Sequence, residues 1–360
     1  MAILDDERLL DDREAIRSVD PAGMGDLIMS LPEQWRKACA IAREATVPAW
    51  ERPERVLVLG LGGSAIGGDL VRSLLEGVSP APIAVNRDYG VPAYVDDRTV
   101  VIASSYSGGT EETLSAVREA EERGARVIAI TTGGELGDLA REKGWPVIRL
   151  PGGLSPRAAI GYSFVPLLVT MERLGLCGSV DAALAETASV LERQRERYGL
   201  DVPASNNPAK RLALELKGRL PLIYGSRGWK GAAAYRWKTQ INENAKAPAY
   251  WNVFPELNHN ETVGWESPAE VMGRVHLVIL RDETDSPRVK ARVDITREIM
   301  EGAVGDVTEL WAEGDSDVAR LFSLIYPGDF VSYYLALAYR NDPTPIKMID
   351  LLKSRLAALG

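Results

Sequence analysis

Two loops of the sequence are rich in glycine and hydroxyl side chains and could hold an anion. One spans Gly60–Gly68, after the apolar run Val56–Leu59, and the other spans Ser104–Thr110, after Val100–Ala103. Glycine lets backbone N–H groups approach an anion, and hydroxyls add donors. These features favour a terminal phosphate, which we expect to contact Gly62, Gly63, Ser64, Ser105, Ser107 and Thr110.

The first loop also fits another class of ligand. Gly60, Gly62 and Ala65 match the glycine pattern of dinucleotide-binding folds. A pyrophosphate needs few side-chain hydroxyls, whereas the second loop carries four Ser or Thr residues. The acid that would bind a ribose is also doubtful, since the second apolar run ends in Asn86-Arg87-Asp88. A phosphate monoester is therefore favoured, and a nicotinamide-dependent enzyme stays an alternative.

Short β-branched runs alternate with amphipathic helical stretches from about residue 51 onward. Such alternation predicts right-handed βαβ units and a parallel sheet. A parallel sheet would place both loops at its carboxyl edge, beside helix N-termini that favour anions. The predicted strands are Val56–Leu59, Ile83–Val85, Val100–Ala103, Val127–Thr131, Val147–Leu150, Leu222–Tyr224, Tyr250–Val253, Val275–Leu280 and Val307–Trp311.

The chain length and a polar stretch at Asp201–Pro208 indicate two domains. A chain of 360 residues exceeds the usual size of a single core. We therefore predict an α/β protein with two doubly wound parallel-sheet domains. The expected parts are a helical segment over 1–50, a first domain over 51–200, a second over 209–340 and a helical tail over 341–360.

Composition and charge exclude several other functions. The net charge of −9 gives no basic surface for nucleic acid. Cys39 and Cys177, the two cysteines, lack metal-ligand spacing and suggest a reducing compartment. The acidic N-terminus differs from a signal peptide, and no apolar run is long enough to suggest a membrane span. We expect a cytoplasmic protein that binds neither nucleic acid nor membrane.

The pairing of Gly-Gly-Ser with Ser-Tyr-Ser-Gly-Gly-Thr resembles the sugar isomerase (SIS) domain, two of which build proteins of the phosphoglucose isomerase superfamily. From about residue 50 onward the chain is similar to the bifunctional phosphoglucose/phosphomannose isomerase family. The most specific stretches are Pro156–Ala159, Asn242–Lys246 and Glu256–Glu261. The sequence departs from the family at Gly109, where an Asn is usual, so that any contact from the Asn side chain is lost.

The resemblance implies a cofactor-free isomerase that interconverts glucose 6-phosphate, and also mannose 6-phosphate, with fructose 6-phosphate. After ring opening, a base moves a proton between C1 and C2 through a cis-enediolate, whose charge needs a cation nearby. The resemblance makes Glu243 the base and Arg157 the stabilising cation. It makes His259 the ring-opening group, contributed by the neighbouring subunit of a homodimer. His276 lies in a predicted strand and is expected to be a core residue.

Two further roles concern the tail. By resemblance, Lys353 assists ring opening, with Lys347 as a competing candidate, and Thr344 is linked to acceptance of mannose 6-phosphate. No metal is expected, because the Cys, His and Asp residues lack ligand spacing, unlike zinc-dependent mannose-phosphate isomerases. A non-catalytic sugar-phosphate sensor remains an alternative, since SIS domains also bind effectors. Against it, no helix-turn-helix segment with a basic face precedes the first domain.

Overall fold

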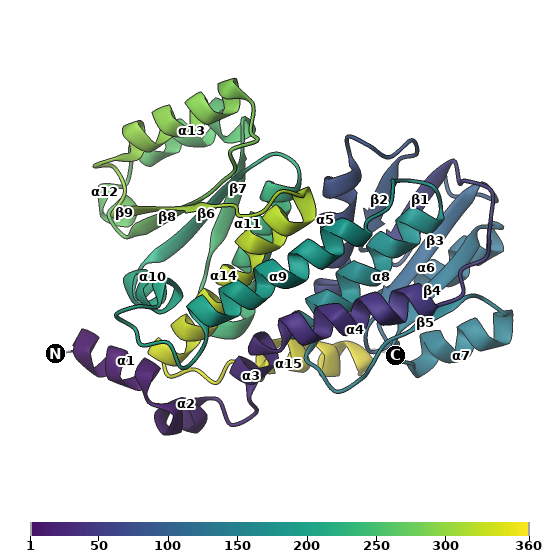
Figure 1. The fold of residues 1–360 in the computed structure, drawn as a ribbon, viewed down its shortest axis with the longest axis horizontal. Helices are drawn as coiled ribbons and strands as arrows, with labels where there is room; N and C mark the ends of the chain where they lie inside the picture. The colour runs from purple at the N-terminus through teal and green to yellow at the C-terminus, as the bar shows by residue number, and fades with distance from the viewer. Residues whose placement is uncertain (1, 359–360) are drawn as a thin grey trace.

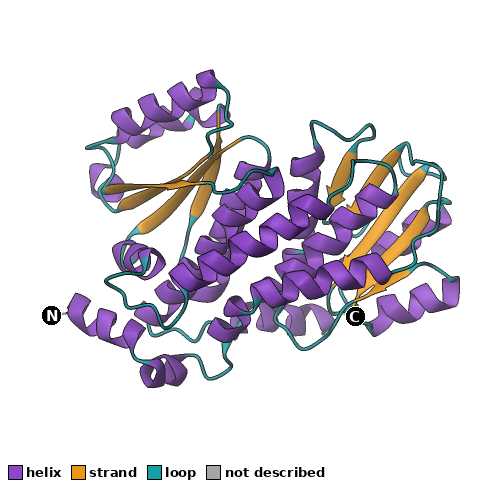
Figure 2. Ribbon diagram, in the orientation of Figure 1, coloured by secondary structure: helices purple, strands orange, loops and turns teal. Residues whose placement is uncertain are grey.

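The structure is a computed structural model that describes residues 2–358. Two parallel sheets lie at opposite ends of the molecule, and long helices fill the space between them (Figures 1 and 2). The largest hydrophobic core combines the facing sides of both sheets with these helices, because Val58, Ile223 and Val278 belong to one cluster. Each sheet has a smaller core on its outer side. The predicted two-lobed α/β architecture is confirmed.

The first sheet has five parallel strands in the order β2-β1-β3-β4-β5. Its order changes direction beside β1, so the loops after β1 and β3 are neighbours, as a binding site at the carboxyl edge requires. In register, Leu57 of β1 pairs with Val101 of β3. The strands are β1 (Arg55–Leu59), β2 (Ile83–Asn86), β3 (Thr99–Ser105), β4 (Arg126–Thr131) and β5 (Val147–Arg149).

The second sheet repeats this order with four strands, β7-β6-β8-β9. It has no counterpart of β5 among the described residues, because β9 leads directly into the long helix α14 (Asp317–Ala338). Each predicted run coincides with a strand whose ends differ from it by two residues or fewer. The strands are β6 (Leu220–Ser226), β7 (Tyr250–Phe254), β8 (Val275–Arg281) and β9 (Asp306–Trp311).

Helices cover both faces of the sheets and precede and follow the two lobes. The N-terminal helices are α1 (Ala2–Asp11), α2 (Arg13–Val19), α3 (Met24–Met29) and α4 (Leu31–Glu44). The first lobe adds α5 (Gly62–Leu75), α6 (Glu111–Glu122), α7 (Gly134–Lys143), α8 (Ile160–Arg173) and α9 (Asp181–Tyr198). The second lobe adds α10 (Pro208–Leu216), α11 (Trp229–Gln240), α12 (Ala269–Met272), α13 (Pro287–Met300) and α14, and the tail forms α15 (Lys347–Ala357).

Helix α14 is longer than its sequence suggests. The pair Pro327-Gly328 reads as a helix end, yet both lie inside the helix. Gly328 is needed for packing, since an added Cβ would lie 2.4 Å from the Trp237 ring. This 22-residue helix also has the composition of a membrane span, with a mean hydropathy of 1.2 over an 18-residue stretch, which was not predicted from the sequence. Its apolar stretch is 100% buried inside the protein, which explains that composition.

The N-terminal helices contact α14 of the second lobe. The buried Asp20 carboxylate accepts hydrogen bonds from the backbone of Met24 and Gly25 and, at 3.0 Å, from the Tyr333 hydroxyl. The Tyr326 hydroxyl donates to the Ile28 carbonyl at 2.9 Å. Residues 20–28 therefore pack against the second lobe, although they precede the first lobe in the sequence.

Candidate active site

The two predicted phosphate loops meet at the carboxyl edge of the first sheet. The Ser105 and Thr110 hydroxyls lie 2.9 Å apart, and Ser105 Oγ accepts the Gly108 N–H at 3.1 Å. The Ser64 hydroxyl, from the other loop, accepts the Tyr106 N–H at 3.3 Å. The structure therefore brings the hydroxyls of both loops to one place, at the start of α5 and α6.

Glycines let the second loop pack tightly on its neighbours. Gly108 has φ +73°, and an added Cβ would lie 1.8 Å from the Gly133 carbonyl oxygen. Gly109 is open by contrast, with nothing within 4 Å of an added Cβ. Ser107 is exposed, and its hydroxyl accepts the Gly109 N–H at 3.3 Å. An Asn at position 109, as in the family, would have room to reach a ligand.

The first loop is pressed against the turn that carries Arg157. A Cβ on Gly63 would lie 2.7 Å from the Pro156 carbonyl oxygen, so glycine permits this approach. Pro156 and Arg157 form the short helix η1 (Pro156–Ala158). The close packing brings the start of α5 and the guanidinium of Arg157 into the same site.

Arg157 is 5% exposed and is held by a dense set of acceptors. Nε donates to Asn244 Oδ1 at 2.8 Å, and Nη1 donates to the Ser155 hydroxyl at 3.1 Å. Nη2 donates to the carbonyls of Pro343 and Thr344, the latter at 2.7 Å. Burial lowers the pKa of Arg157, but an arginine stays protonated.

This arrangement leaves Arg157 one free donor. A guanidinium has five N–H groups, of which four are used as just described. The fifth is on Nη1, which lies 3.7 Å from Glu243 Oε2. The buried cation therefore offers its remaining hydrogen to the space beside Glu243, where a negative charge would be stabilised.

Glu243 lies in the π-helical turn η2 (Ile241–Ala245). Single π turns within helices are frequent at functional sites. The next residue, Asn244, is buried and donates to the Ser332 hydroxyl at 3.0 Å while accepting from Arg157. The turn is therefore fixed from both sides, and the Glu243 carboxylate remains partly exposed.

One small cavity joins these features. It contains the glycine loop, the guanidinium and the carboxylate that the sequence predicted. Two further arginines also line it, and each is paired with an aspartate, Arg87 with Asp69 and Arg236 with Asp329. Its lining consists of Gly62, Gly63, Ile66, Arg87, Arg157, Tyr235, Arg236, Thr239, Gln240 and Glu243.

The part of this lining that comes from α11 was not predicted from the sequence: Tyr235, Arg236, Thr239 and Gln240. Tyr235, Thr239 and Glu243 follow one another at intervals of four residues, which places them on one helix face. That spacing could have identified them. Arg87 was also not predicted as a site residue, although it directly follows β2 and so lies at the same edge of the sheet.

Other predicted residues lie outside this cavity. His259 ends the short helix η3 (Glu256–His259), is exposed, and lines neither cavity that contains Glu243. Lys353 is exposed on α15, whereas Lys347 lines a second groove that also includes Glu243. Thr344 is tied to Arg157 through its carbonyl.

The second histidine is a core residue, as predicted. His276 is 1% exposed, and its Nε2 lies 2.8 Å from the Thr308 hydroxyl. Burial lowers the pKa of this imidazole, against the attraction of Asp306. The ring is bonded inside the sheet and does not line the cavity.

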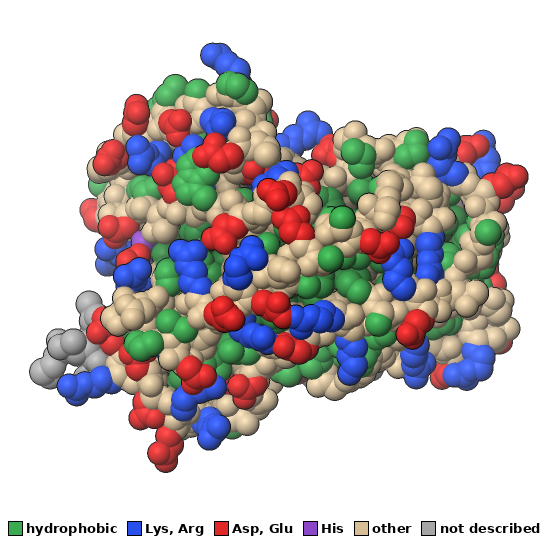
Figure 3. Space-filling model, viewed as in Figure 1, with side chains coloured by type: hydrophobic (Ala, Val, Ile, Leu, Met, Phe, Trp, Pro, Cys, Tyr) green, Lys and Arg blue, Asp and Glu red, His purple; other side chains and the backbone are tan. Residues whose placement is uncertain are grey.

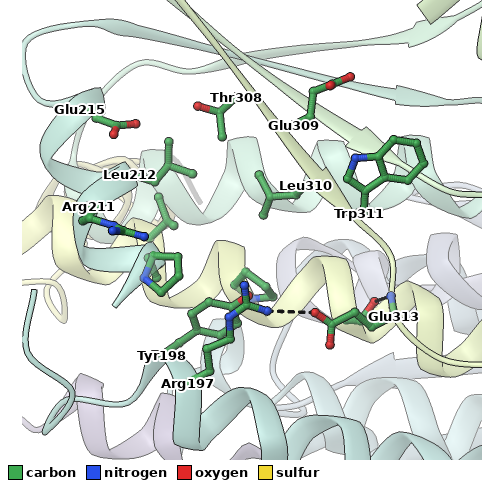
Figure 4. A pocket seen from close by; sticks show the side chains of 15 residues that line it. Arg197, Tyr198, Arg211, Leu212, Glu215, Thr308, Glu309, Leu310, Trp311 and Glu313 are labelled. Carbon is green, nitrogen blue, oxygen red and sulfur yellow. Dashed lines mark hydrogen bonds and ion pairs between the residues drawn. The ribbon is translucent and has the colours of Figure 1, made fainter. Parts of the chain in front are cut away.

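A larger groove lies between the end of α9 and the second lobe, under the edge strand β9 and beside α10 and α14 (Figure 4). Arg197 and Glu313 form a 3.1 Å ion pair across it. It includes no predicted site residue. Figure 3 shows acidic and basic side chains interspersed over one whole face of the molecule, with no extended patch of either sign.

The fold and the paired hydroxyl loops define a protein with two SIS domains. The SIS domain family matches residues 51–144, and the family described as the bacterial phospho-glucose isomerase C-terminal SIS domain matches residues 205–356. A solved structure titled as a glucose-6-phosphate isomerase like protein from Thermus thermophilus shares the fold, with a TM-score of 0.61 and 24% identity, over 93% of this chain and 96% of that one.

Curated relatives narrow the class. The chain is 52% identical to the bifunctional phosphoglucose/phosphomannose isomerase of Caldicellulosiruptor bescii, over 93% of this chain and 99% of the relative. It is 33% identical to a D-glucosamine-6-phosphate 4-epimerase of Sulfolobus acidocaldarius, over 64% of this chain and 70% of the relative. The chain belongs to the bifunctional phosphoglucose/phosphomannose isomerase family. The fold, family and isomerase class expected from the sequence are confirmed.

Proposed function

We propose that this protein interconverts glucose 6-phosphate, and also mannose 6-phosphate, with fructose 6-phosphate, and that it needs no cofactor. The observation that carries the proposal is the cavity in which the glycine loop, Arg157 and Glu243 meet. A phosphate held by the hydroxyl loops would direct the other end of the sugar toward the carboxylate. The name of the 52% identical relative supports the same pair of substrates.

In the proposed reaction, the Glu243 carboxylate takes the proton from C2 of the open-chain aldose. The released electron pair forms the C1=C2 double bond, and the carbonyl oxygen at C1 becomes an oxyanion. The free N–H of Arg157 stabilises this charge. The C2 hydroxyl then passes its proton to the C1 oxyanion, and Glu243 returns its proton to C1 as the C2–O bond becomes the carbonyl, which gives the ketose. Mannose 6-phosphate differs from glucose 6-phosphate at C2 and yields the same enediolate.

We further propose that His259 opens the sugar ring from the partner subunit of a homodimer. Within residues 2–358 of one chain, the imidazole lines neither cavity that holds Glu243, so a single subunit does not supply it. Because His259 is exposed on η3, its side chain can reach the active site of a second copy of the chain. The proposed active site is therefore shared between two chains.

Mixing inactive variants tests the shared site. Neither Glu243→Gln nor His259→Ala homodimers should turn over efficiently, but subunit exchange gives heterodimers with one intact site. Random exchange should restore roughly a quarter of wild-type activity, because half of the dimers carry one working site of two. No recovery after exchange, confirmed by a tagged subunit, would mean that His259 acts within its own chain, and an active His259→Ala homodimer would mean that it has no role.

The two tail residues have separate tests. Lys347 lines the groove beside Glu243, and Lys353 does not, so Lys347→Met should slow ring opening more than Lys353→Met. The reverse order would return the role to Lys353. For Thr344, replacement by Ala should lower turnover of mannose 6-phosphate relative to glucose 6-phosphate, and an unchanged ratio would remove it from substrate selection.

The decisive experiment assays both sugar phosphates in parallel with purified protein. Conversion of each to fructose 6-phosphate, lost on Glu243→Gln, supports the proposal. Binding of either sugar without turnover would favour the sensor. Saturable nicotinamide binding would favour the dinucleotide alternative, and a product altered at C4 would indicate an epimerase.

A further inference from the structure

Lys246 follows the π turn that carries Glu243 and has a strained backbone. Its φ of 55° lies in the left-handed region, which among the described non-glycine residues is shared only by Arg340. For an L-residue other than Gly or Asn this conformation costs about 1 kcal/mol. Residues held in such conformations cluster at functional sites. The proposed mechanism uses Glu243 and leaves this lysine without a role.

The side chain of Lys246 joins two segments that are far apart in sequence. Its Nζ donates to the carbonyl of Glu243 at 2.8 Å and to the carbonyl of Pro343 at 2.9 Å. Arg157 donates to the same Pro343 carbonyl. The backbone of the base and the segment before α15 are therefore connected by one ammonium group, next to the guanidinium.

A third bond strengthens this connection. The Asn341 side-chain amide donates to the Ala245 carbonyl at 2.9 Å, which lies between Glu243 and Lys246 in the chain. A π turn forms i→i+5 hydrogen bonds in place of the i→i+4 bonds of an α-helix, so some backbone carbonyls near it lose their usual partner. The carbonyls of Glu243 and Ala245 accept bonds from side chains instead, and both bonds lead to the 341–343 segment.

We propose that Lys246 is a positioning residue that fixes the Glu243 carboxylate by tying the carbonyl of the base to Pro343. The proposal rests on the isomerase function proposed above. Lys246 acts through the backbone of Glu243 and is not required to touch the substrate. Because a misplacement of about 1 Å can slow a reaction about 100-fold, this tie affects the chemical step more than substrate binding.

The charges around Lys246 make the strength of its two hydrogen bonds depend on pH. Burial of the ammonium and the charge of Arg157 lower the pKa of Lys246 to about 8, against the attraction of Asp342 and Glu243. Lys347, which lines the same groove, adds positive charge on the α15 side. Above that pKa the amine is neutral, and a hydrogen bond from a neutral donor is about half as strong as one from a cation. The rate should therefore fall as pH rises through about 8.

Two variants remove the ammonium group of Lys246, and a third, at another lysine, is the control. Lys246→Met removes both bonds, and Lys246→Gly does so while favouring the left-handed backbone, which protects folding. Lys238→Met is the matched control, since Lys238 is half-buried on the neighbouring α11. We expect kcat for fructose 6-phosphate to fall about 10- to 100-fold in both Lys246 variants, with KM within about twofold and the control unchanged.

The pH profile separates positioning from a loss of folding. The alkaline decline near pH 8 should disappear in Lys246→Met and Lys246→Gly and move upward in Lys246→Arg, which should also recover most of kcat. If both ammonium-free variants match the Lys238→Met control, or if KM changes as much as kcat, the proposal is wrong. An inactive wild-type protein would instead reject the isomerase function itself.

Discussion

Replacing Arg157 by Lys tests how a buried cation supports catalysis in this protein. The side chain is 5% exposed, and its fork reaches Asn244, Ser155 and two carbonyls at once. A lysine keeps the charge, but its single nitrogen cannot bond acceptors on opposite sides of the fork. Buried acceptors that lose a charged donor cost roughly 1–3 kcal/mol each, so we expect the free energy of unfolding to fall by about 3 kcal/mol.

The same substitution removes the free N–H that faces Glu243. Loss of one such donor typically lowers kcat by about 10²–10³. The assays are urea unfolding and coupled turnover of fructose 6-phosphate, with Arg141→Lys as control because the Arg141 side chain is 74% exposed. If Arg157→Lys keeps kcat within about threefold of wild type, or loses less than about 1 kcal/mol of stability, the role given to its fork is refuted.

Three other predictions follow from the site and the core. Glu243→Gln should lower kcat by ~10²–10⁴ without a change in the thermal midpoint, and a large shift in that midpoint would mean that the carboxylate has a structural role. Gly108→Ala should raise KM strongly, because the added Cβ would clash with the Gly133 carbonyl. Gly109→Ala should bind substrate nearly as well as wild type, because nothing lies within 4 Å of its added Cβ. Equal kinetics of the two variants would contradict the packing described. Burial raises the pKa of the Cys39 and Cys177 thiols to about 11. Native protein at pH 8 should therefore react with iodoacetamide far more slowly than urea-unfolded protein. Rapid labelling of the native form would disprove that burial.

Much of the site could be predicted because its signals are local in the sequence. Ser105 ends a strand and Thr110 directly precedes a helix, and that order alone places their hydroxyls at an anion-binding edge. The stretches around Arg157 and Glu243 resemble those of the isomerase family, and in the structure Arg157 Nη1 lies 3.7 Å from Glu243 Oε2. In these cases the local pattern and the final environment agree.

The rest depends on contacts that no local pattern records. The bond from Arg157 to the Pro343 carbonyl spans 186 residues, and a carbonyl acceptor leaves no mark in side-chain identity. The π turn at Glu243 exists because Asn244 and Lys246 find partners on other segments. Helix α14 continues through Pro327 because Trp237 packs against Gly328. Tertiary contacts there override the local preference for a break.

The bridge between the N-terminal helices and α14 has a consequence for synthesis on the ribosome. The hydrogen bonds of Tyr333 to Asp20 and of Tyr326 to Ile28 span 313 and 298 residues. Helices α2 and α3 leave the exit tunnel before either lobe and must therefore wait for α14, while the strands of the first sheet find their neighbours early. We expect the apolar faces of the early helices to stay uncovered during translation, which makes the nascent chain a client for chaperones.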